Sequence, residues 1–141
     1  MRLSNLNPLH LVYRLADRLR WRAHQNLGRE GEDRAHRWLR RQGWIVAARN
    51  WSPPQGGGEI DIVAWDGAEL VFVEVKTRAH GSASSPERAI EDDKITALRR
   101  SARDYVRRSG ATPASVRMDV ISISGTELLY LRDAFSAEVS V

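Results

Sequence analysis

The sequence contains no cysteine, only two lysines and no long hydrophobic run. The absence of cysteine excludes disulfide bonds, thiolate zinc sites and cysteine nucleophiles. No apolar stretch approaches the length of a transmembrane helix, and arginines interrupt the N-terminal stretch too early for the core of a signal peptide. We therefore expect a soluble, cytoplasmic protein without a membrane span.

Lysine is scarce because arginine supplies 20 of the 22 basic residues, and the two lysines are Lys76 and Lys94. Arginine can serve most surface and phosphate-binding roles, so a position that keeps lysine can indicate a need for a compact ammonium group that deprotonates. The alternative is a compositional bias that left two lysines by chance.

The positive charge is concentrated in the N-terminal third of the 141 residues, a length typical of one domain. The net charge is +4 and the pI about 10.1, which favours an acidic partner, nucleic acid first. Residues 1–41 hold 10 arginines and 4 acidic residues, a net charge of +6, whereas residues 42–141 carry −2. The basic third would attract a nucleic-acid backbone independently of its sequence.

An amphipathic basic helix is predicted within residues 1–26, from a cap at Asn7-Pro8 to about His24. Its polar side carries Arg14, Arg18 and Arg22 at four-residue steps. A solvated face is the simpler interpretation of this strip, and contact with phosphates or an anionic surface is the alternative. The apolar side could also dock a protein partner.

Residues 27–141 are predicted to form one α/β domain with a mixed sheet of about five strands flanked by helices. The expected helices span 29–42 and 86–108, and the expected strands span 44–49, 59–65, 70–76, 116–124 and 127–131. The dipeptide Asp66-Gly67 predicts a tight hairpin between the second and third strands.

The strand 70–76 carries the most informative charges. Side chains alternate along a strand, so Glu74 and Lys76 share a face with Phe72, while the valines between them fill the other face. Apolar residues on both faces predict a central, covered strand. Charges at its end would be expensive to leave unpaired, so they need each other, a metal ion or a substrate.

Asp61 on the preceding strand is predicted to lie on the same face. With Asp66-Gly67 as a two-residue turn, Asp61 falls opposite Phe72 and diagonal to Glu74, with about 7 Å between the side-chain bases. A three-residue loop would reverse this relation unless a bulge restored it. Two carboxylates and a lysine are what metal-assisted phosphodiester cleavage requires, because Mg²⁺ prefers oxygen ligands and a lysine can orient the attacking water or take its proton. A salt-bridged cluster at the end of the sheet is the structural alternative.

Two further residues are candidates for the functional site. Glu32 lies on the apolar stripe of the helix 29–42, where the helix dipole does not explain an acidic residue. Trp51, next to the loop 52–58, is the best candidate among the tryptophans for stacking on a base.

Several separate motifs follow one another in the order found in a known family: Gly28-Arg-Glu-Gly-Glu32, Asn50, Gly58-Glu-Ile-Asp61, Phe72-Val-Glu-Val-Lys-Thr-Arg78, Lys94, Arg117-Met-Asp-Val120 and Ala134-Phe135. In these residues the chain resembles the YraN-type family of bacterial proteins over about residues 27–135. That family is similar in turn to the restriction-endonuclease-like, PD-(D/E)XK nucleases, with archaeal Holliday-junction resolvases as structural relatives.

The resemblance implies a catalytic set of Glu32, Asp61, Glu74 and Lys76. Asp61 and Glu74 would bind Mg²⁺ or Mn²⁺, with the backbone carbonyl of Val75 as an additional ligand, and Lys76 would be the catalytic lysine. Candidate contacts to nucleic acid are Arg29, Trp51, Arg78 and Lys94. Lys94 could instead pair only with acidic neighbours on its own helix.

The leading functional hypothesis is a Mg²⁺-dependent endonuclease, a hydrolase of phosphodiester bonds that acts on nucleic acid. DNA is favoured over RNA, and the DNA could be branched or damaged. A homodimer would suit a two-fold symmetric junction. The alternatives are a nucleic-acid-binding module without catalysis and a protein-interaction factor that docks through the N-terminal helix.

Overall fold

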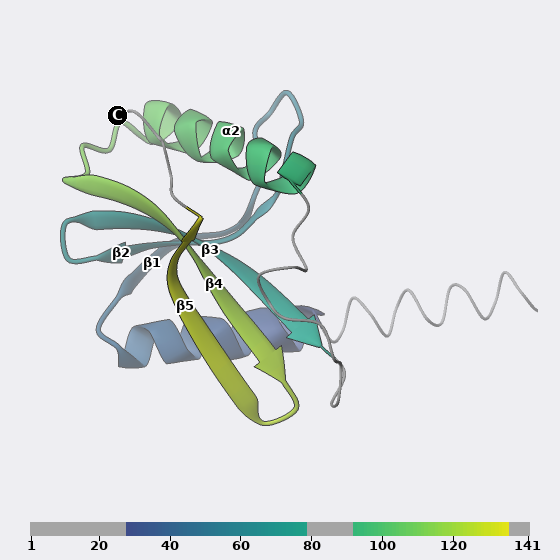
Figure 1. Cartoon of the computed structure of the whole chain (residues 1–141). Helices are drawn as coiled ribbons and strands as arrows, with labels where there is room; N and C mark the ends of the chain where they lie inside the picture. The colour runs from purple at the N-terminus through teal and green to yellow at the C-terminus, as the bar shows by residue number, and fades with distance from the viewer. Residues whose placement is uncertain (1–27, 79–91, 136–141) are drawn as a thin grey trace, which may run out of the picture.

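A mixed sheet of five strands lies between two helices in the computed structural model, which describes residues 28–78 and 92–135 (Figure 1). In chain order the elements are a first helix over 28–41, β1 (Ile45–Trp51), β2 (Ile60–Asp66), β3 (Glu69–Arg78), α2 (Asp92–Ser109), β4 (Ser115–Ser124) and β5 (Glu127–Phe135). The strand order is β1-β2-β3-β4-β5, and only the β3–β4 pair is parallel. The predicted α/β class is confirmed.

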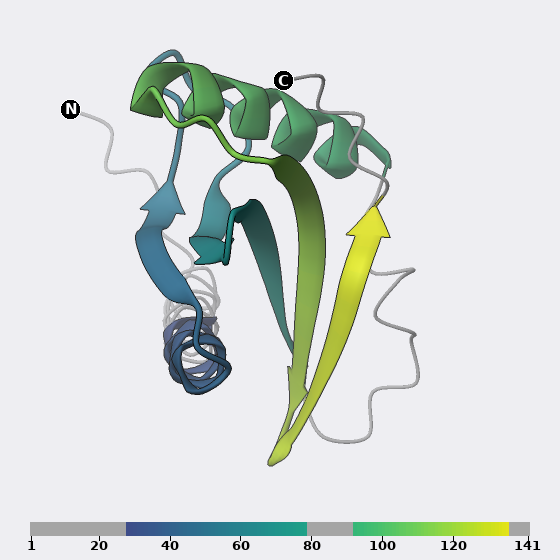
Figure 2. The ribbon, with the colours of Figure 1, turned by 90° about the vertical axis from the view of Figure 1, so that its left-hand side faces the viewer.

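The two helices cover opposite faces of the sheet (Figure 2). Ala35 and Leu39 of the first helix pack in one core cluster with Val73 of β3. Leu98 of α2 packs in the other cluster with Phe72. β3 is therefore central and covered on both faces, as its continuous apolar sequence predicts.

The hairpin between β2 and β3 turns one residue later than predicted. Asp66 pairs with Glu69, so the turn residues are Gly67 and Ala68, and Gly67 takes the left-handed φ of +60°. The predicted turn at Asp66-Gly67 is wrong in position, although a two-residue turn is correct.

This displacement moves the register of the hairpin by two residues and leaves the faces unchanged. Ile62 lies opposite Val73, and one further step along the ladder aligns Asp61 with Glu74. Phe72, the partner predicted for Asp61, lies opposite Val63 instead. Asp61 and Glu74 are therefore direct neighbours across the strands, closer than the predicted diagonal.

Arg117 on β4 explains why Asp66 stays in the strand. Its guanidinium lies 2.9 Å from Asp66 and also pairs with Glu69, so the first and last residues of the hairpin turn share one cation. The Arg117 Nε donates to Asp119 at 3.1 Å. Asp119, whose side chain is 0% exposed, also accepts a hydrogen bond from the Tyr130 hydroxyl. This buried network, which we call the Arg117 network, ties β2, β3, β4 and β5 together.

The ends of the elements differ from the predictions by a few residues. The first helix ends in a Schellman motif, in which the Trp44 N–H donates to the Leu39 carbonyl and Gly43 has a φ of +89°. β1 includes Trp51, and β3 and β5 extend to Arg78 and Phe135. Residues 86–91 of the second predicted helix lie outside the described residues. The same holds for the predicted N-terminal helix with Arg14, Arg18 and Arg22.

Membrane spanning by a helix is not indicated. Neither helix in the part of the chain that the structure describes combines the length and the apolar character that crossing a bilayer requires.

Gly31 lets the first helix approach β3 closely, and Gly31→Ala is expected to destabilise the protein. A Cβ at this position would lie 2.1 Å from Thr77 Oγ1, so Thr77 or the helix must shift. We expect a net loss of about 1–3 kcal/mol in urea unfolding, although alanine favours the helix by about 1 kcal/mol. Gly28→Ala is the matched control, because an added Cβ there meets nothing within 4 Å. If Gly31→Ala destabilised the Thr77→Ala protein as much as it destabilises the wild type, the contact with Thr77 Oγ1 would not be the cause.

Candidate active site

Asp61 and Glu74 meet where β2 begins and β3 approaches its end. The backbone N–H of Val75 donates to Asp61 Oδ2 at 2.8 Å, which fixes the carboxylate across the two strands. Glu74 is buried, with its side chain 5% exposed. The structure thus brings together the two carboxylates that the sequence singles out. The Val75 backbone reaches the site through its N–H, and the ligand role predicted for its carbonyl stays a prediction.

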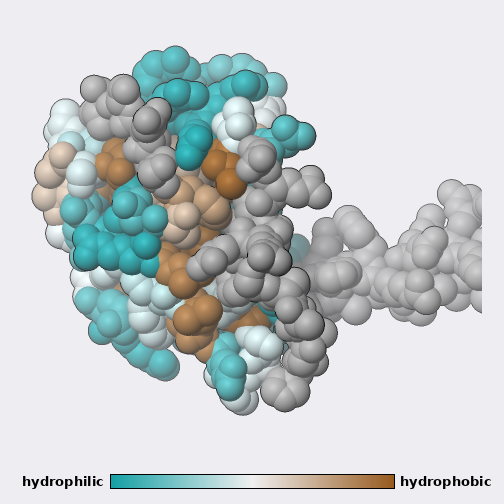
Figure 3. Space-filling model, in the orientation of Figure 1, coloured by the Kyte–Doolittle hydropathy of each residue, from teal (hydrophilic) through white to brown (hydrophobic). Residues whose placement is uncertain are grey.

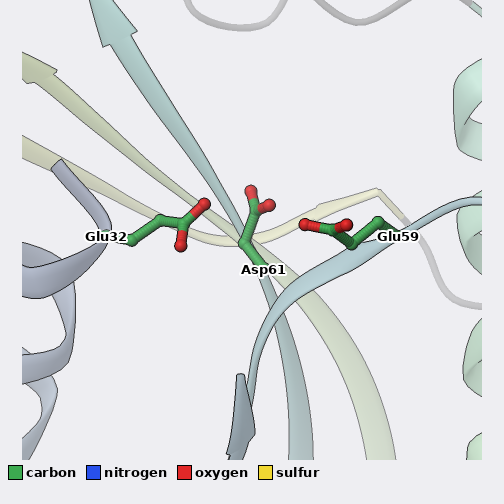
Figure 4. A group of neighbouring side chains, drawn as sticks. All are labelled: Glu32, Glu59 and Asp61. Atoms are coloured by element: carbon green, nitrogen blue, oxygen red, sulfur yellow. The ribbon is translucent and has the colours of Figure 1, made fainter. Parts of the chain in front are cut away.

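Two further carboxylates converge on Asp61 from neighbouring segments. Glu32 projects from the first helix and Glu59 from the residue before β2, and both point toward Asp61 (Figure 4). One carboxylate oxygen of each lies within 4.8 Å of the others, which is the spacing of ligands around a metal ion. Glu74 is not a member of this three-acid cluster. The buried stripe of the first helix therefore does carry Glu32 to the site, whereas Glu59 had no assigned role.

Gly58 holds Glu59 in place by packing directly against α2. A Cβ at Gly58 would lie 3.2 Å from the backbone carbonyl carbon of Ala97. Ser101 donates a hydrogen bond from its hydroxyl to the Gly58 carbonyl at 2.7 Å. Only glycine fits this approach without displacing the helix, so the motif Gly58–Asp61 combines a packing residue with two acids.

Both lysines of the chain contact the same carboxylate. The ammonium group of Lys76 lies 3.5 Å from Glu74 Oε1, and Lys94 on α2 forms an ion pair with the same oxygen. Lys94 therefore reaches across to β3 rather than pairing only on its own helix. Two lysines that converge on one acid favour the view that lysine is kept here for its chemistry, because random placement among 22 basic positions would seldom produce this.

The proximity of these groups shifts their pKa values. Burial, the charge of Glu74 and a hydrogen bond with it raise the pKa of Asp61 to about 8, against a partial lowering by the Val75 N–H. Burial and the contact with Lys94 lower the pKa of Lys76. Burial opposes the charge on Lys94, but its contacts with Glu74 outweigh this and raise its pKa. At neutral pH the protein alone therefore favours the protonated form of Asp61, and a bound cation would favour the ionised form.

The stability of the metal-free protein is expected to fall as the pH rises from about 4 to about 8. The Asp61 carboxyl keeps its proton up to a pKa of about 8 in the folded protein but has a pKa of 3.8 when unfolded, so unfolding releases a proton in this window. One such proton gives a slope of up to about 1.4 kcal/mol per pH unit. Urea unfolding in EDTA at several pH values should show a flatter dependence for Asp61→Asn than for the wild type. Asp133→Asn, which alters an exposed carboxylate, is the control, and equal slopes for Asp61→Asn and the wild type would contradict this assignment.

A cavity of about 450 Å³ opens beside the cluster, lined by Gly28, Arg29, Glu32, Asn50 and Glu59. Arg29 was predicted to contact nucleic acid, and it lies on this wall. Asn50, within β1, adopts a left-handed φ of +50°, which asparagine tolerates better than most residues.

Arg49 is a site residue that the sequence did not reveal. It lies 3.5 Å from Glu32 and 2.7 Å from Asp33, so it links the first helix to β1. No local motif marks this arginine, because its two acidic partners lie 16 and 17 residues away. The remaining predicted contacts are Trp51 and Arg78. Trp51 packs its ring against Tyr105 at 5.2 Å rather than standing on a loop, and Arg78 ends β3.

The arrangement combines oxygen ligands for a hard cation with an amine whose pKa is lowered. Carboxylates held within a few ångströms bind Mg²⁺ or Mn²⁺, and an adjacent amine can accept a proton from water. An acid–acid–lysine set at the end of a covered strand, within a mixed sheet between helices, is consistent with the restriction-endonuclease-like class of folds.

Comparison with known proteins identifies the family. The model of the uncharacterised protein family UPF0102 matches residues 31–123, and the chain belongs to this family, which is the YraN-type family that the motifs indicate. A UPF0102 protein of Solibacter usitatus is 50% identical over 129 residues, which cover 89% of this chain and 98% of the relative. UPF0102 proteins of Koribacter versatilis and Desulfosudis oleivorans are 37% and 38% identical, over 79% and 82% of this chain and 80% and 94% of the relatives.

Proposed function

We propose that this protein is a Mg²⁺- or Mn²⁺-dependent phosphodiesterase that acts on nucleic acid, with DNA favoured over RNA. One observation carries the proposal: Asp61, which is partly buried, lies against the buried Glu74, with two more carboxylates within 4.8 Å of Asp61 and both lysines of the chain on Glu74. A cluster kept only for stability would not need these carboxylates gathered at one point, because like charges held close together repel one another.

The residues fit a divalent cation by their chemistry. Asp61 would be the central ligand, joined by Glu74 and by Glu32 or Glu59, and the Val75 carbonyl is a further candidate. The raised pKa of Asp61, about 8, supports this assignment, since a cation would favour the ionised form that the protein alone disfavours. When bound, the metal would polarise the phosphodiester and lower the pKa of an attacking water.

The lysines would divide two tasks between them. Lys76 shares the β3 face with Glu74, and its lowered pKa suits a group that orients the attacking water and accepts its proton. Lys94 would hold the Glu74 carboxylate from α2 and place positive charge beside the developing phosphate charge. The first helix would keep Glu32 aimed at the site, with Arg49 steadying its carboxylate at 3.5 Å.

The substrate class follows from charge as well as chemistry. A net charge of +4, with an excess of arginine in residues 1–41, favours a polyanion. Arg29 on the cavity wall would meet a phosphate beside the scissile bond. A cytoplasmic site of action suits such a substrate, and branched or damaged DNA is the preferred form within this class.

Cleavage of a labelled panel tests the proposal directly. Single-stranded, duplex, flap and four-way-junction DNA, with matched RNA strands, would be incubated with Mg²⁺, Mn²⁺ or EDTA. We expect cleavage with either metal, none with EDTA, and a preference for one DNA structure. Binding without cleavage of any substrate would support a non-catalytic binding module instead. A protein that neither binds nor cleaves any of these substrates would favour the protein-interaction factor instead.

A further inference from the structure

A second cavity, of about 480 Å³, lies between the loop 52–58 and α2. Its wall differs in character from the acidic cluster, because basic side chains supply most of the charge. The residues that line it are Pro53, Gln55, Gly56, Gly57, Arg100, Ser101, Arg103, Asp104 and Arg107. We call this feature the α2 groove. The space-filling view shows hydrophilic residues gathered over α2 (Figure 3).

Three arginines of the α2 groove form a line along one side of the helix. Arg100, Arg103 and Arg107 recur at i, i+3 and i+7, which places them on one helical face. Arg100 and Arg103 are exposed, and neither has an ion pair to another described residue. Two guanidinium groups are therefore free to bind an anion from solution.

Asp104 is the single acidic residue on the wall of the groove, and its charge is already satisfied. One of its oxygens pairs with Arg107, and the other accepts from the Arg108 Nε at 2.8 Å. Arg108 also donates to the Gln55 side chain at 3.1 Å and so fastens the loop to the helix. The carboxylate thus orients two arginines instead of cancelling the charge of the groove.

The loop side of the groove includes two glycines, whose backbone is not covered by a side chain of its own. Gly56 and Gly57 have φ values of +86° and +143°, which only glycine adopts readily. A Cβ at Gly56 would meet nothing within 4 Å, so the space above it is open. Glycines in this conformation allow the phosphate of a ligand to approach closely.

We propose that the α2 groove binds the phosphodiester backbone of nucleic acid and directs the strand toward the acidic cluster. The inference rests on the proposed function for its substrate class and adds the surface that holds the substrate. Seven residues of helix span about 10 Å, so the three arginines extend over more than one phosphate of a strand, a length that a single small anion would not require.

The groove also leads to the candidate active site. Its loop continues directly into Glu59 and Asp61, and Ser101, which lines the groove, donates to the carbonyl of Gly58. A backbone bound along α2 therefore adjoins the segment that supplies two of the three clustered acids.

Fluorescence anisotropy with a labelled DNA duplex in EDTA tests this inference, because it measures binding without cleavage. The full chain would be compared with Arg100→Gln/Arg103→Gln at three salt concentrations. Loss of two phosphate contacts should weaken binding about 10- to 100-fold at 0.1 M salt and reduce the slope of log K against log salt by about 2. Thermal unfolding should be nearly unchanged, since both side chains are exposed.

Arg37→Gln/Arg41→Gln is the matched control. These arginines line a separate cavity on the first helix, on the other face of the sheet, and the variant loses the same charge. It therefore reports the general attraction by the basic residues 1–41, and the additional loss in Arg100→Gln/Arg103→Gln measures the contribution of the α2 groove. An equal loss of affinity in both double variants would overturn the inference, as would a wild-type chain that does not bind the duplex. Inorganic pyrophosphate, tested as a competitor and as a ligand, would overturn it if it bound at Arg100 and Arg103 while the duplex did not. Normal duplex binding by a chain that cleaves nothing would refute the proposed activity and leave the groove intact.

Discussion

Replacing Glu74 by glutamine is expected to lower metal-dependent cleavage by about a thousand-fold or more. The change keeps the shape of the side chain but removes the charge that meets Asp61 and both lysines. Stabilisation of transition-state charge by a bound metal ion is worth several kcal/mol, and each 1.4 kcal/mol changes the rate by a factor of ten. Single-turnover cleavage of the preferred substrate, at saturating protein, measures the effect on the chemical step.

The control for this variant is Glu127→Gln, which removes an exposed carboxylate at the β4–β5 turn. Its rate should equal that of the wild type. Duplex affinity in EDTA should be nearly the same for all three proteins, because Glu74 lies outside the α2 groove. Cleavage by Glu74→Gln at the wild-type rate would place the active site elsewhere or trace the activity to a contaminant.

Replacing Arg117 by methionine is expected to destabilise the fold by about 3–5 kcal/mol. Arg117 is 8% exposed and neutralises Asp119, whose side chain is fully buried. Removal of one member of a buried ion pair leaves an uncompensated charge, and this cost dominates the effect. Asp66 and Glu69 lose their common partner as well, so the β2–β3 hairpin is weakened in the same step. Urea unfolding at pH 7 measures the change.

Arg132→Met is the control on the neighbouring strand. Arg132 is 63% exposed and lies 3.5 Å from Glu69, so its loss should cost less than about 1 kcal/mol. The double variant Arg117→Met/Asp119→Asn should recover part of the stability, because the unpaired charge is then absent. If the double variant were less stable than Arg117→Met alone, the hydrogen bonds that Asp119 accepts from the Tyr130 hydroxyl and the Asp133 backbone N–H would outweigh the cost of its unpaired charge.

The placement of the candidate site residues was largely predictable because it depends on short-range patterns. Alternation along 70–76 assigns Glu74 and Lys76 to one face, and the apolar stripe around Ala35 points Glu32 inward. These periodicities are properties of local backbone geometry. They hold in the structure because both faces of β3 are covered as the sequence requires.

The strand register and the tertiary contacts were not predictable to the same degree. The position of the hairpin turn depends on Arg117, about 50 residues further along the chain, which holds Asp66 in the strand. The pairing of Lys94 with Glu74 depends on where α2 crosses the sheet. Such contacts arise from packing between distant segments, and no local spacing encodes them.

Glu59 and Arg49 illustrate a different limit. Glu59 looks like an ordinary exposed acid before a strand, and its place in the cluster follows from the close packing of Gly58 against α2. Arg49 lies on the strand beside β2 and meets two acids of the first helix. A single sequence does not indicate which of its many arginines forms an ion pair with an acid distant in the chain.

The convergence of both lysines on Glu74 gives the chain an unusual property for spectroscopy. Reagents that modify primary amines, such as those used for reductive methylation, find only two side-chain targets among 141 residues, and both are beside the candidate metal ligands. Isotope-labelled methyl groups introduced there would report on the candidate active site, with no other side-chain amine to add background. The scarcity that first drew attention to lysine thus supplies a pair of built-in reporters at the place where they are most informative.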